Sequence, residues 1–447
     1  MGGEKGVVDV EAVVVGAGIA GLATALALRR TGVARADGDG GGGVVVLERH
    51  AGLRATGAAL TIFPNGWFAL RALGVAHKLT SRYDSYQTSV VTNLESGSTQ
   101  VFRFGGHKTR SGEAGLKVRP VHRKALLEAM AEELPPGTIR FNSKLTSIST
   151  EPAAAGDDDE ELAVVRLEDG TAIRSKVLIG CDGVNSVVAR WLGLSEPASS
   201  GRSCVRGLAV FPAAAGGGHG VKKELRQFLS HGIRAGMVPI SDTDIYWFVV
   251  NNTIPAGKAK KEAGGDPEKI MREVTDNLGR HLPDEFLDVA RHSDPDNLTW
   301  APLLYRAPWA ILTGRASRGP VTVAGDAFHP MTPDMAQGGC AALEDAVVLA
   351  RALSRSRRAA DGAAAYVAER RLRAAWIVAG AYLSGYVQQG STDASPRGVR
   401  ALAVKLFRDL IFYRFIFPFL ADTMWFDCGH LEYSEAGKEE KKKSHVH

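Results

Sequence analysis

Residues 13–21 have the sequence Val-Val-Val-Gly-Ala-Gly-Ile-Ala-Gly, and this stretch decides the fold. The valines predict a buried parallel strand, and Gly16, Gly18 and Gly21 complete the spacing G-x-G-x-x-G before a helix-forming run over 21–30. In this pattern the first glycine permits a tight turn, the second lets backbone N–H groups approach a pyrophosphate, and the third lets the helix pack closely on the strand. The stretch therefore predicts a dinucleotide-binding strand, turn and helix, with an ordinary glycine-rich turn as the alternative.

A second apolar run, residues 44–47, ends at Glu48. An acidic side chain at the end of the second strand accepts hydrogen bonds from ribose hydroxyls and repels a 2′-phosphate. Glu48 therefore favours FAD or NAD over NADP as the resident nucleotide. The connection before this strand contains the low-complexity stretch 36–43, which we interpret as a disordered surface loop because a longer loop costs little free energy.

The composition argues against several classes of protein. The net charge of +5 is small and the basic residues are scattered, so we expect no nucleic-acid partner. No stretch reaches about 18 uncharged apolar residues, so no transmembrane span is expected. The first strand begins near residue 10, which leaves no room for a targeting peptide before it. The four cysteines, Cys181, Cys204, Cys340 and Cys428, have neither the spacing of a disulfide framework nor that of a metal site. We therefore expect a reducing, cytoplasmic location and no metal site.

Several motifs follow one another in an order that is more specific than any one of them. They are the fingerprint at 16–21, Val121-His122-Arg123, Cys181-Asp182-Gly183, Gly-Asp-Ala-Phe-His-Pro at 325–330, and a segment beginning Gln-Gly-Gly at 337–346. Over roughly residues 10–430 the chain resembles the single-component FAD-dependent aromatic hydroxylases, especially plant monooxygenases related to salicylate hydroxylase and 3-hydroxybenzoate 6-hydroxylase. The resemblance implies a para-hydroxybenzoate-hydroxylase-like fold, bound FAD and reduction by NADH or NADPH. It also implies that a flavin C4a-hydroperoxide inserts one atom of O₂ into a small, phenolic acid-like aromatic substrate.

The predicted nucleotide-binding elements are separated by β-rich segments. We therefore expect an α/β protein with a discontinuous Rossmann-like FAD-binding domain, an inserted antiparallel-sheet substrate domain and C-terminal helices. The expected FAD-binding domain comprises 8–84, 116–196 and 315–375, and the substrate domain comprises 85–115 and 197–314. A C-terminal helical segment over 376–436 and a disordered tail over 437–447 complete the chain. The aromatic stretch 402–420 is expected to cover the flavin domain, with a membrane-binding helix as the alternative.

The motif near residue 325 supplies candidate cofactor ligands. Gly325 and Asp326 follow a buried strand, where the carboxylate can accept hydrogen bonds from ribityl or ribose hydroxyls; a turn or helix cap is the alternative. Gln337, Gly338 and Gly339 precede an apolar helix, whose N-terminal N–H groups would face the negatively charged edge of a reduced flavin. The two glycines leave room for the ring, although they also suit a helix start without a ligand.

Two further positions are candidate nucleotide contacts. Arg123 lies in the first turn of an expected helix, where a cation opposes the helix dipole, so a ligand contact would explain its placement. The resemblance implies that Arg123 contacts FAD, with Arg119 as a weaker second candidate. It also implies that Asp182 and Gly183 serve both FAD and the nicotinamide nucleotide, joined by Arg190. The alternative for Asp182 is a helix cap. No second G-x-G-x-x-G occurs, so NADH or NADPH is expected to dock transiently.

Candidate substrate contacts are weaker. His329 could act as a general base because the pKa of histidine lies near neutrality, and a packing role is the alternative. Arg234 could anchor a substrate carboxylate, and a solvated rim position is its alternative. His329, Met331, Thr332 and Pro333 are expected on the substrate side of the flavin. Two other functions stay open, namely epoxidation or oxidation of an isoprenoid-like apolar substrate and a flavin-binding regulatory role.

Overall fold

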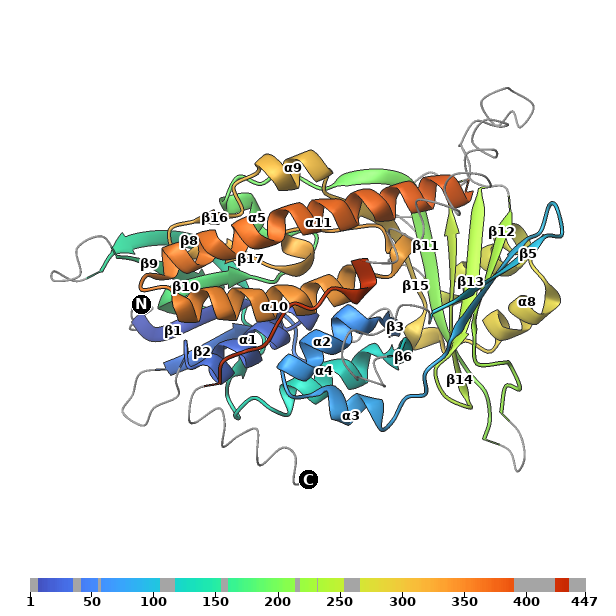
Figure 1. The fold of residues 1–447 in the computed structure, drawn as a ribbon, viewed down its shortest axis with the longest axis horizontal. Helices are drawn as coiled ribbons and strands as arrows, with labels where there is room; N and C mark the ends of the chain where they lie inside the picture. Colours follow the sequence, from blue (N-terminus) through green and yellow to red (C-terminus); the bar gives the residue numbers. More distant parts are fainter. Residues whose placement is uncertain are drawn as a thin grey trace.

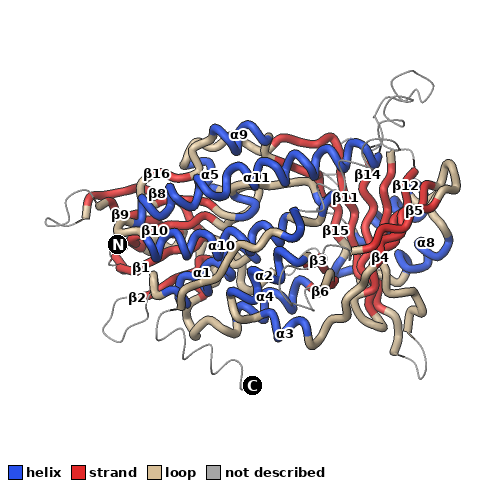
Figure 2. The backbone as a smooth tube through the Cα atoms, in the orientation of Figure 1, coloured by secondary structure: helices blue, strands red, loops and turns tan. Residues whose placement is uncertain are grey.

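The computed structural model describes residues 7–34, 42–54, 58–104, 117–153, 160–213, 218–230, 232–252, 266–389 and 423–433. Within these ranges two large sheets lie toward opposite ends of an elongated molecule, and most of the long helices lie over the first sheet (Figures 1 and 2). The predictions for the stretch 402–420 and for the tail 437–447 fall outside the described residues.

The first sheet has a parallel centre. It consists of β1 (Val7–Val15), β2 (Gly42–Leu47), β7 (Ile139–Arg140), β8 (Leu145–Pro152), β9 (Glu161–Leu167), β10 (Ala172–Gly180), β16 (Ser317–Arg318) and β17 (Val321–Val323). The strand order is β16-β17-β10-β1-β2-β7, and β9 pairs with β10 and β8. β1 runs parallel to β10 and β2, and the last four residues of β1 are buried, as expected for a parallel strand with both faces covered.

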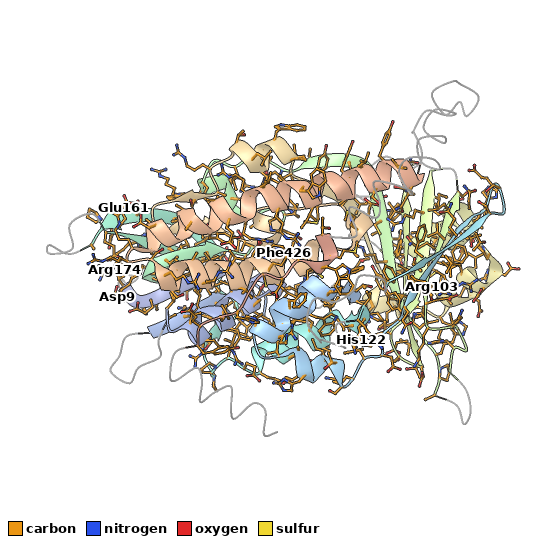
Figure 3. The ribbon with its side chains drawn as sticks, viewed as in Figure 1. Asp9, Arg103, His122, Glu161, Arg174 and Phe426 are labelled. Atoms are coloured by element: carbon orange, nitrogen blue, oxygen red, sulfur yellow. The ribbon has the colours of Figure 1, made fainter. Side chains whose placement is uncertain are left out.

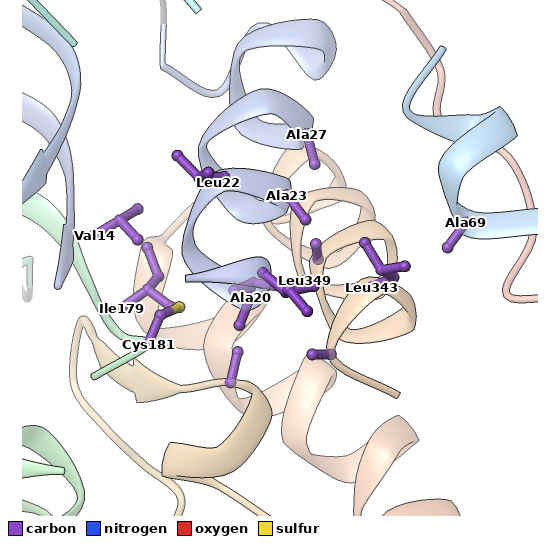
Figure 4. Close-up of a cluster of buried hydrophobic side chains, with 14 of the residues drawn as sticks. Val14, Ala20, Leu22, Ala23, Ala27, Ala69, Ile179, Cys181, Leu343 and Leu349 are labelled. Atoms are coloured by element: carbon purple, nitrogen blue, oxygen red, sulfur yellow. The ribbon is translucent and has the colours of Figure 1, made fainter. Parts of the chain in front are cut away.

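The helix α1 (Ile19–Thr31) covers the first sheet, and α10 (Gly338–Arg355) packs on α1. α1 is rich in alanine and leucine and is buried almost all round, because it lies between the sheet and α10. Figure 4 shows Ala20, Ala23 and Ala27 of α1 among the side chains of β1 and α10. The small side chains let three layers approach closely, which accounts for the alanine-rich sequence after the glycine fingerprint.

The second sheet has seven strands in the order β15-β11-β14-β13-β12-β4-β5. They are β4 (Thr88–Asn93), β5 (Thr99–Arg103), β11 (Ala198–Val210), β12 (Leu225–Ser230), β13 (Ile233–Pro239), β14 (Asp244–Asn251) and β15 (Thr299–Tyr305). Alternate side chains point to opposite faces of a strand. Ala235, Met237 and Trp247 therefore pack on one face, in a core completed by the helices over 267–291. The intervening residues face the first sheet.

The remaining elements connect the two sheets and cover their edges. They are the paired strands β3 (Ala59–Ile62) and β6 (Arg119–His122); the helices α2 (Pro64–Ala72), α3 (Ala76–Thr80), α4 (Arg123–Ala131), α5 (Val187–Trp191), α7 (Pro267–Arg272), α8 (Asp284–Arg291), α9 (Pro308–Thr313) and α11 (Ala359–Gln389); and the short turns of helix η1 (Glu273–Leu278), η2 (Pro295–Asn297), η3 (Gly325–Ala327), η4 (Pro333–Met335) and η6 (Thr423–Trp425). β6 contacts the second sheet through His122, whose Nε2 lies 3.1 Å from Oδ2 of Asp244 (Figure 3).

The fold class agrees with the expected architecture. The first sheet takes its strands from within the segments assigned to the FAD-binding domain, and the second sheet takes its strands from the two substrate-domain segments. Two details differ. The expected boundary at residues 375 and 376 falls inside α11, which is one continuous helix because its buried side packs along α10 and α9. α8 was not expected from the sequence; its buried face packs against β14 and β11.

Candidate active site

One cavity of about 590 Å³ spans the two sheets. It begins at the carboxyl ends of the parallel strands, where Val15, Leu47 and Cys181 form part of its wall. It continues to the inner face of the second sheet, where Tyr246 and Phe248 line it. The carboxyl edge of a parallel sheet is where open α/β folds bind ligands, so the first half of the cavity is the expected nucleotide site.

The three fingerprint glycines have different structural reasons. Gly16 has φ +103°, and an added Cβ would lie 2.5 Å from the carbonyl oxygen of Cys181. At Gly21 an added Cβ would lie 1.8 Å from the carbonyl oxygen of Gly16, so α1 requires glycine to pack on the turn. A Cβ at Gly18 would meet nothing within 4 Å, and Gly18 lines the cavity at the N-terminus of α1. The space beside Gly18 and the helix N-terminus fits a pyrophosphate.

Glu48 is fixed beside the fingerprint. Its Oε2 accepts a hydrogen bond from the backbone N–H of Ala17 at 3.0 Å, and its Oε1 accepts one from that of His50 at 3.0 Å. A carboxylate oxygen can accept more than one hydrogen bond, so both oxygens keep capacity for a ligand hydroxyl. Glu48 lines the cavity, in the position that the sequence predicts for a ribose contact.

Asp326 and Arg123 line the cavity together. Asp326, in η3, exposes its carboxylate there. The guanidinium of Arg123 is largely buried at the start of α4, and its Nε has no hydrogen-bond partner among the described residues. Burial lowers the pKa of Arg123, and the negative charge of Asp326 partly offsets this. A buried N–H without a partner is costly, so a polar ligand group would satisfy it.

Gly325 has a packing role. It has φ +60°, and an added Cβ would lie 2.8 Å from Cβ of Ala20 in α1. Its backbone N–H donates to Oδ2 of Asp345 at 2.8 Å. The glycine thus lets η3 approach α1 and places Asp326 at the cavity wall.

The start of α10 also reaches the cavity. Gly338 and Gly339 line it, and the atom nearest to a Cβ added at Gly338 would be Cγ of Met331, at 3.8 Å. Free N–H groups at the start of this 18-residue helix favour negative charge nearby. Gln337 faces the protein interior, where its Oε1 accepts a hydrogen bond from Nδ2 of Asn65 at 2.8 Å. The structure therefore brings the two glycines to the cavity and gives Gln337 a packing position.

Asp182 lines the cavity but also caps a helix. Its carboxylate accepts hydrogen bonds from Oγ of Ser186 at 2.5 Å and from the N–H of Val187 at 2.7 Å, at the start of α5. Burial raises the pKa of Asp182, and these hydrogen bonds oppose the increase. Gly183, with φ +82°, lines the cavity next to it. The capping alternative is therefore present in the structure, alongside a place in the cavity wall.

The two secondary arginine candidates lie elsewhere. Arg190 is exposed, and its Nε lies 3.0 Å from Oε1 of Glu196. Nε of Arg119 donates to the carbonyl oxygen of Tyr83 at 3.0 Å, and its guanidinium lies over the ring of Trp67. Neither arginine is among the described residues that line the cavity, so neither position supports a nucleotide contact.

His329 does not reach the cavity wall. Its ring is fully buried, and Nε2 lies 2.6 Å from Oδ2 of Asp345. Burial alone would raise the pKa of Asp345, but His329 and Arg370 together with the N–H of Gly325 lower it to about 2. A fully buried ring that is hydrogen-bonded to Asp345 and lies outside the cavity wall cannot contact a substrate there, so the geometry favours the packing alternative over the general base.

Arg234 is in the cavity wall but is already paired. Its Nη1 donates to Oδ1 of Asp334 at 2.9 Å, and its Nε and Nη2 donate to Oε1 of Gln227 at 3.0 and 2.7 Å. Arg202 donates to both oxygens of Asp334, at 3.0 and 2.7 Å. Burial would raise the pKa of Asp334, but the two arginines hold it below its usual value. This arrangement differs from both the substrate anchor and the solvated rim position.

The ion cluster of Arg202, Arg234 and Asp334 also connects the two halves of the site. The arginines belong to β11 and β13, whereas Asp334 belongs to η4. The loop over 331–336, which includes three of the four expected substrate-side residues, lines the cavity. The cluster therefore fixes the position of this loop against the second sheet.

Several cavity residues were not found from the sequence, among them Arg206, Tyr246 and Phe248. Burial raises the pKa of Tyr246 to about 12, and the positive charge of Arg206 partly opposes this. An added Cβ at Gly236 would lie 2.6 Å from Cζ of Phe248, so this glycine makes room for the ring. The alternation in these strands is visible in the sequence, but it does not say which face is turned to the cavity.

Comparison with known proteins agrees with the geometry. Residues 9–381 match the family described as FAD binding domain. The chain is 35% identical to "Monooxygenase 2" of Arabidopsis thaliana, over 96% of this chain and 99% of that protein, and 34% identical to "Monooxygenase 1" of the same plant, over 95% and 100%. It resembles the structure of Klebsiella pneumoniae HpxO complexed with FAD and uric acid, with a TM-score of 0.73, 24% identity, and coverage of 93% of this chain and 96% of that one.

The chain belongs to the FAD binding domain family and is an FAD-dependent monooxygenase of the aromatic hydroxylase type. Across the described ranges, no group of histidine, cysteine and acidic side chains is arranged to hold a metal ion. No described helix has the length and apolar character needed to cross a membrane. All four cysteines are free and buried.

Proposed function

We propose that this monooxygenase hydroxylates a small anionic aromatic substrate, such as a phenolic acid, with NADH or NADPH as the reductant. The proposal rests on one cavity of about 590 Å³ whose two halves have different linings. The half at the glycine fingerprint has the shape and donors for a dinucleotide. The half at the second sheet has aromatic walls and the guanidinium of Arg206.

The residues of the first half fit FAD. The open space at Gly18 would receive the pyrophosphate, Glu48 would bind ribose, and Asp326 would bind a sugar or ribityl hydroxyl. The unpartnered Nε of Arg123 would donate to the cofactor. When bound, FAD supplies the ring that takes up hydride and transfers one oxygen atom of O₂ to the substrate. The N-terminus of α10 at Gly338 would stabilise negative charge on that ring.

The second half fits an aromatic ring. Phe102, Tyr246 and Phe248 give it apolar walls, which exclude water and restrict the orientation of a bound ring. Because the pKa of Tyr246 is about 12, its phenol is protonated at neutral pH and could donate a hydrogen bond to a bound substrate rather than accept a proton from it. Arg206 adds a positive charge at this wall, and it favours a substrate that carries a carboxylate or phenolate.

The nicotinamide nucleotide has no fingerprint of its own in the sequence. Gly183 and Asn185 lie on the cavity wall beside the expected FAD site. We propose that NADH or NADPH docks there transiently, delivers hydride and leaves before the substrate is oxidised.

The test is the rate of NADH and NADPH oxidation by the FAD-loaded protein, with and without a panel of phenolic acids. We expect an acid that accelerates oxidation and yields a hydroxylated product with one atom from ¹⁸O₂. Gly18→Val, which should lack FAD, is the control for reduction that does not depend on the cofactor. Epoxide formation from an isoprenoid would instead favour the second function, and FAD binding without any turnover would favour a regulatory role.

A further inference from the structure

Arg206 is a charged side chain of the cavity wall that has no ion-pair partner among the described residues. It belongs to β11, is partly buried and lines the cavity. The groups that act on its charge are the thiol of Cys204, the phenol of Tyr246 and, more weakly, the carboxylate of Asp326. Because sulfur is a weak hydrogen-bond acceptor, the thiol leaves most N–H donors of the guanidinium available to a ligand.

The buried arginines of the described ranges differ from Arg206, because each is bonded within the protein. They are Arg30 with Glu133, Arg202 and Arg234 with Asp334, Arg306 with two carbonyl oxygens, and Arg370 with Glu344 and Asp345. A buried charge without a partner is strongly destabilising. Arg123 and Arg206 both line the cavity, and neither has an ion-pair partner among the described residues. Arg123 is assigned to FAD, so Arg206 calls for a second anion.

The surrounding groups cannot neutralise Arg206. Burial raises the pKa of the Cys204 thiol, and it raises that of Tyr246 to about 12, so both groups are neutral at pH 7. Asp334 already bonds two arginines. The negative charge of Asp326 acts on both Arg123 and Arg206, so one carboxylate serves two guanidinium groups. The cavity therefore keeps a surplus positive charge.

The second sheet places this charge beside an aromatic ring. Arg206 and Phe248 are partners in the register of β11 and β14, so their side chains are neighbours on the cavity face. Val205 and Trp247 belong to the core on the opposite face. A Cβ added at Gly236 would lie 2.6 Å from Cζ of Phe248, so the ring extends over β13. The end of Arg206 is thus left to a ligand that packs along the ring.

We propose that Arg206 binds the carboxylate of the substrate and thereby selects aromatic acids over neutral aromatic compounds. The inference rests on the proposed hydroxylation of an aromatic substrate and names the residue that recognises it. A guanidinium forms two parallel hydrogen bonds with a carboxylate, whereas a phenolate presents a single oxygen. The assignment differs from the anchor expected at Arg234, since Asp334 and Gln227 already bond that side chain.

The test measures binding to the FAD-loaded protein without reductant, from the change in flavin absorbance. The probes are benzoate and salicylate, each compared with its amide. We expect each acid to bind about 10- to 100-fold more tightly than its amide, the range for hydrogen bonds to a charged group. Arg206→Gln should remove this preference and keep its FAD. Arg206→Lys should keep the preference but bind both acids more weakly, since an ammonium cannot form the parallel pair.

Arg315→Gln is the matched control, because it removes the same charge from an exposed position outside the cavity wall. It should bind all four probes as the unmodified protein does. Amides that bind as tightly as acids, no binding of any probe, or an acid preference that persists in Arg206→Gln would overturn the inference. Loss of FAD from both Arg206 variants but not from the control would overturn it by assigning the guanidinium to the cofactor.

The same variants separate this inference from the proposed function. Acids that bind through Arg206 but are never hydroxylated would contradict the proposed function and leave the inference standing. Hydroxylation of an aromatic acid with the same KM in Arg206→Gln as in the unmodified protein would contradict the inference alone.

Discussion

Replacing Asp334 with asparagine tests the buried ion cluster. The side chain of Asp334 is 0% exposed, and Arg202 and Arg234 are each 8% exposed. Asparagine keeps the volume but leaves two buried guanidinium groups without their shared negative charge. Removing one partner of a buried ion pair costs about 3–5 kcal/mol. With an unfolding entropy of about 2.1 cal/mol/K per residue, a chain of 447 residues should lose roughly 3–5 °C in Tm.

The assay is thermal unfolding of the FAD-loaded protein at neutral pH, followed by circular dichroism and flavin fluorescence. Asp361→Asn is the matched control, because Arg358 also donates two hydrogen bonds to Asp361, but both side chains are about half exposed. The control should cost no more than about 1 kcal/mol. Because the pKa of Asp334 is lowered from 3.8, its contribution is present above that pH and is lost as the pH falls through the folded value. An Asp334→Asn protein that melts within about 1 °C of the control would refute the reasoning.

Four further predictions follow from the site. Gly18→Val should give folded protein without FAD, whereas Gly21→Ala should lower Tm because the added Cβ would lie 1.8 Å from the carbonyl oxygen of Gly16. The flavin-to-protein ratio and the Tm distinguish the two variants. Asp326→Ala should weaken FAD by about 1–3 kcal/mol in a fluorescence titration, and normal affinity would contradict the assignment. His329→Gln should lower Tm but leave the pH profile of kcat unchanged; loss of the fall in kcat at low pH would restore the general-base role. Because the pKa of Asp345 is lowered to about 2, its carboxylate should contribute about 2 kcal/mol to the free energy of unfolding above about pH 4. This contribution should be lost as the pH falls from about 4 to about 2, which acid unfolding would measure.

Most of the residues that the sequence assigns to the nucleotide half line the cavity, because their positions depend on local sequence. Gly16, Gly18 and Gly21 are fixed by the geometry of one turn, and Glu48 by its place at the end of the next strand. Each can be recognised from spacing alone. The start of α2 at Pro64 is also set locally, since proline suits the first helical position.

The substrate half could not be predicted because it depends on pairings between distant segments. Arg206, Tyr246 and Phe248 face the cavity only because of the register between β11 and β14. Arg234 and Asp334 are a hundred positions apart, so nothing near Arg234 shows that its guanidinium is already bonded. His329 likewise lies in a motif beside the cofactor site, yet Asp345 in the next helix holds its ring in the interior.

The parallel sheet also sets the order of events during synthesis. Val13 pairs with Leu178, and Leu178 pairs with Val321, so the centre of the sheet joins three widely separated stretches of chain. At about 5–20 residues per second, a ribosome makes β17 roughly 15–60 s after β1. Until β10 is made, the valine-rich first strand has no partner on one side, and from then until β17 is made β10 itself lacks one; such unpaired strands are prone to aggregate. Because the cavity lies at the carboxyl ends of these strands, capture of FAD is expected to follow assembly of the sheet.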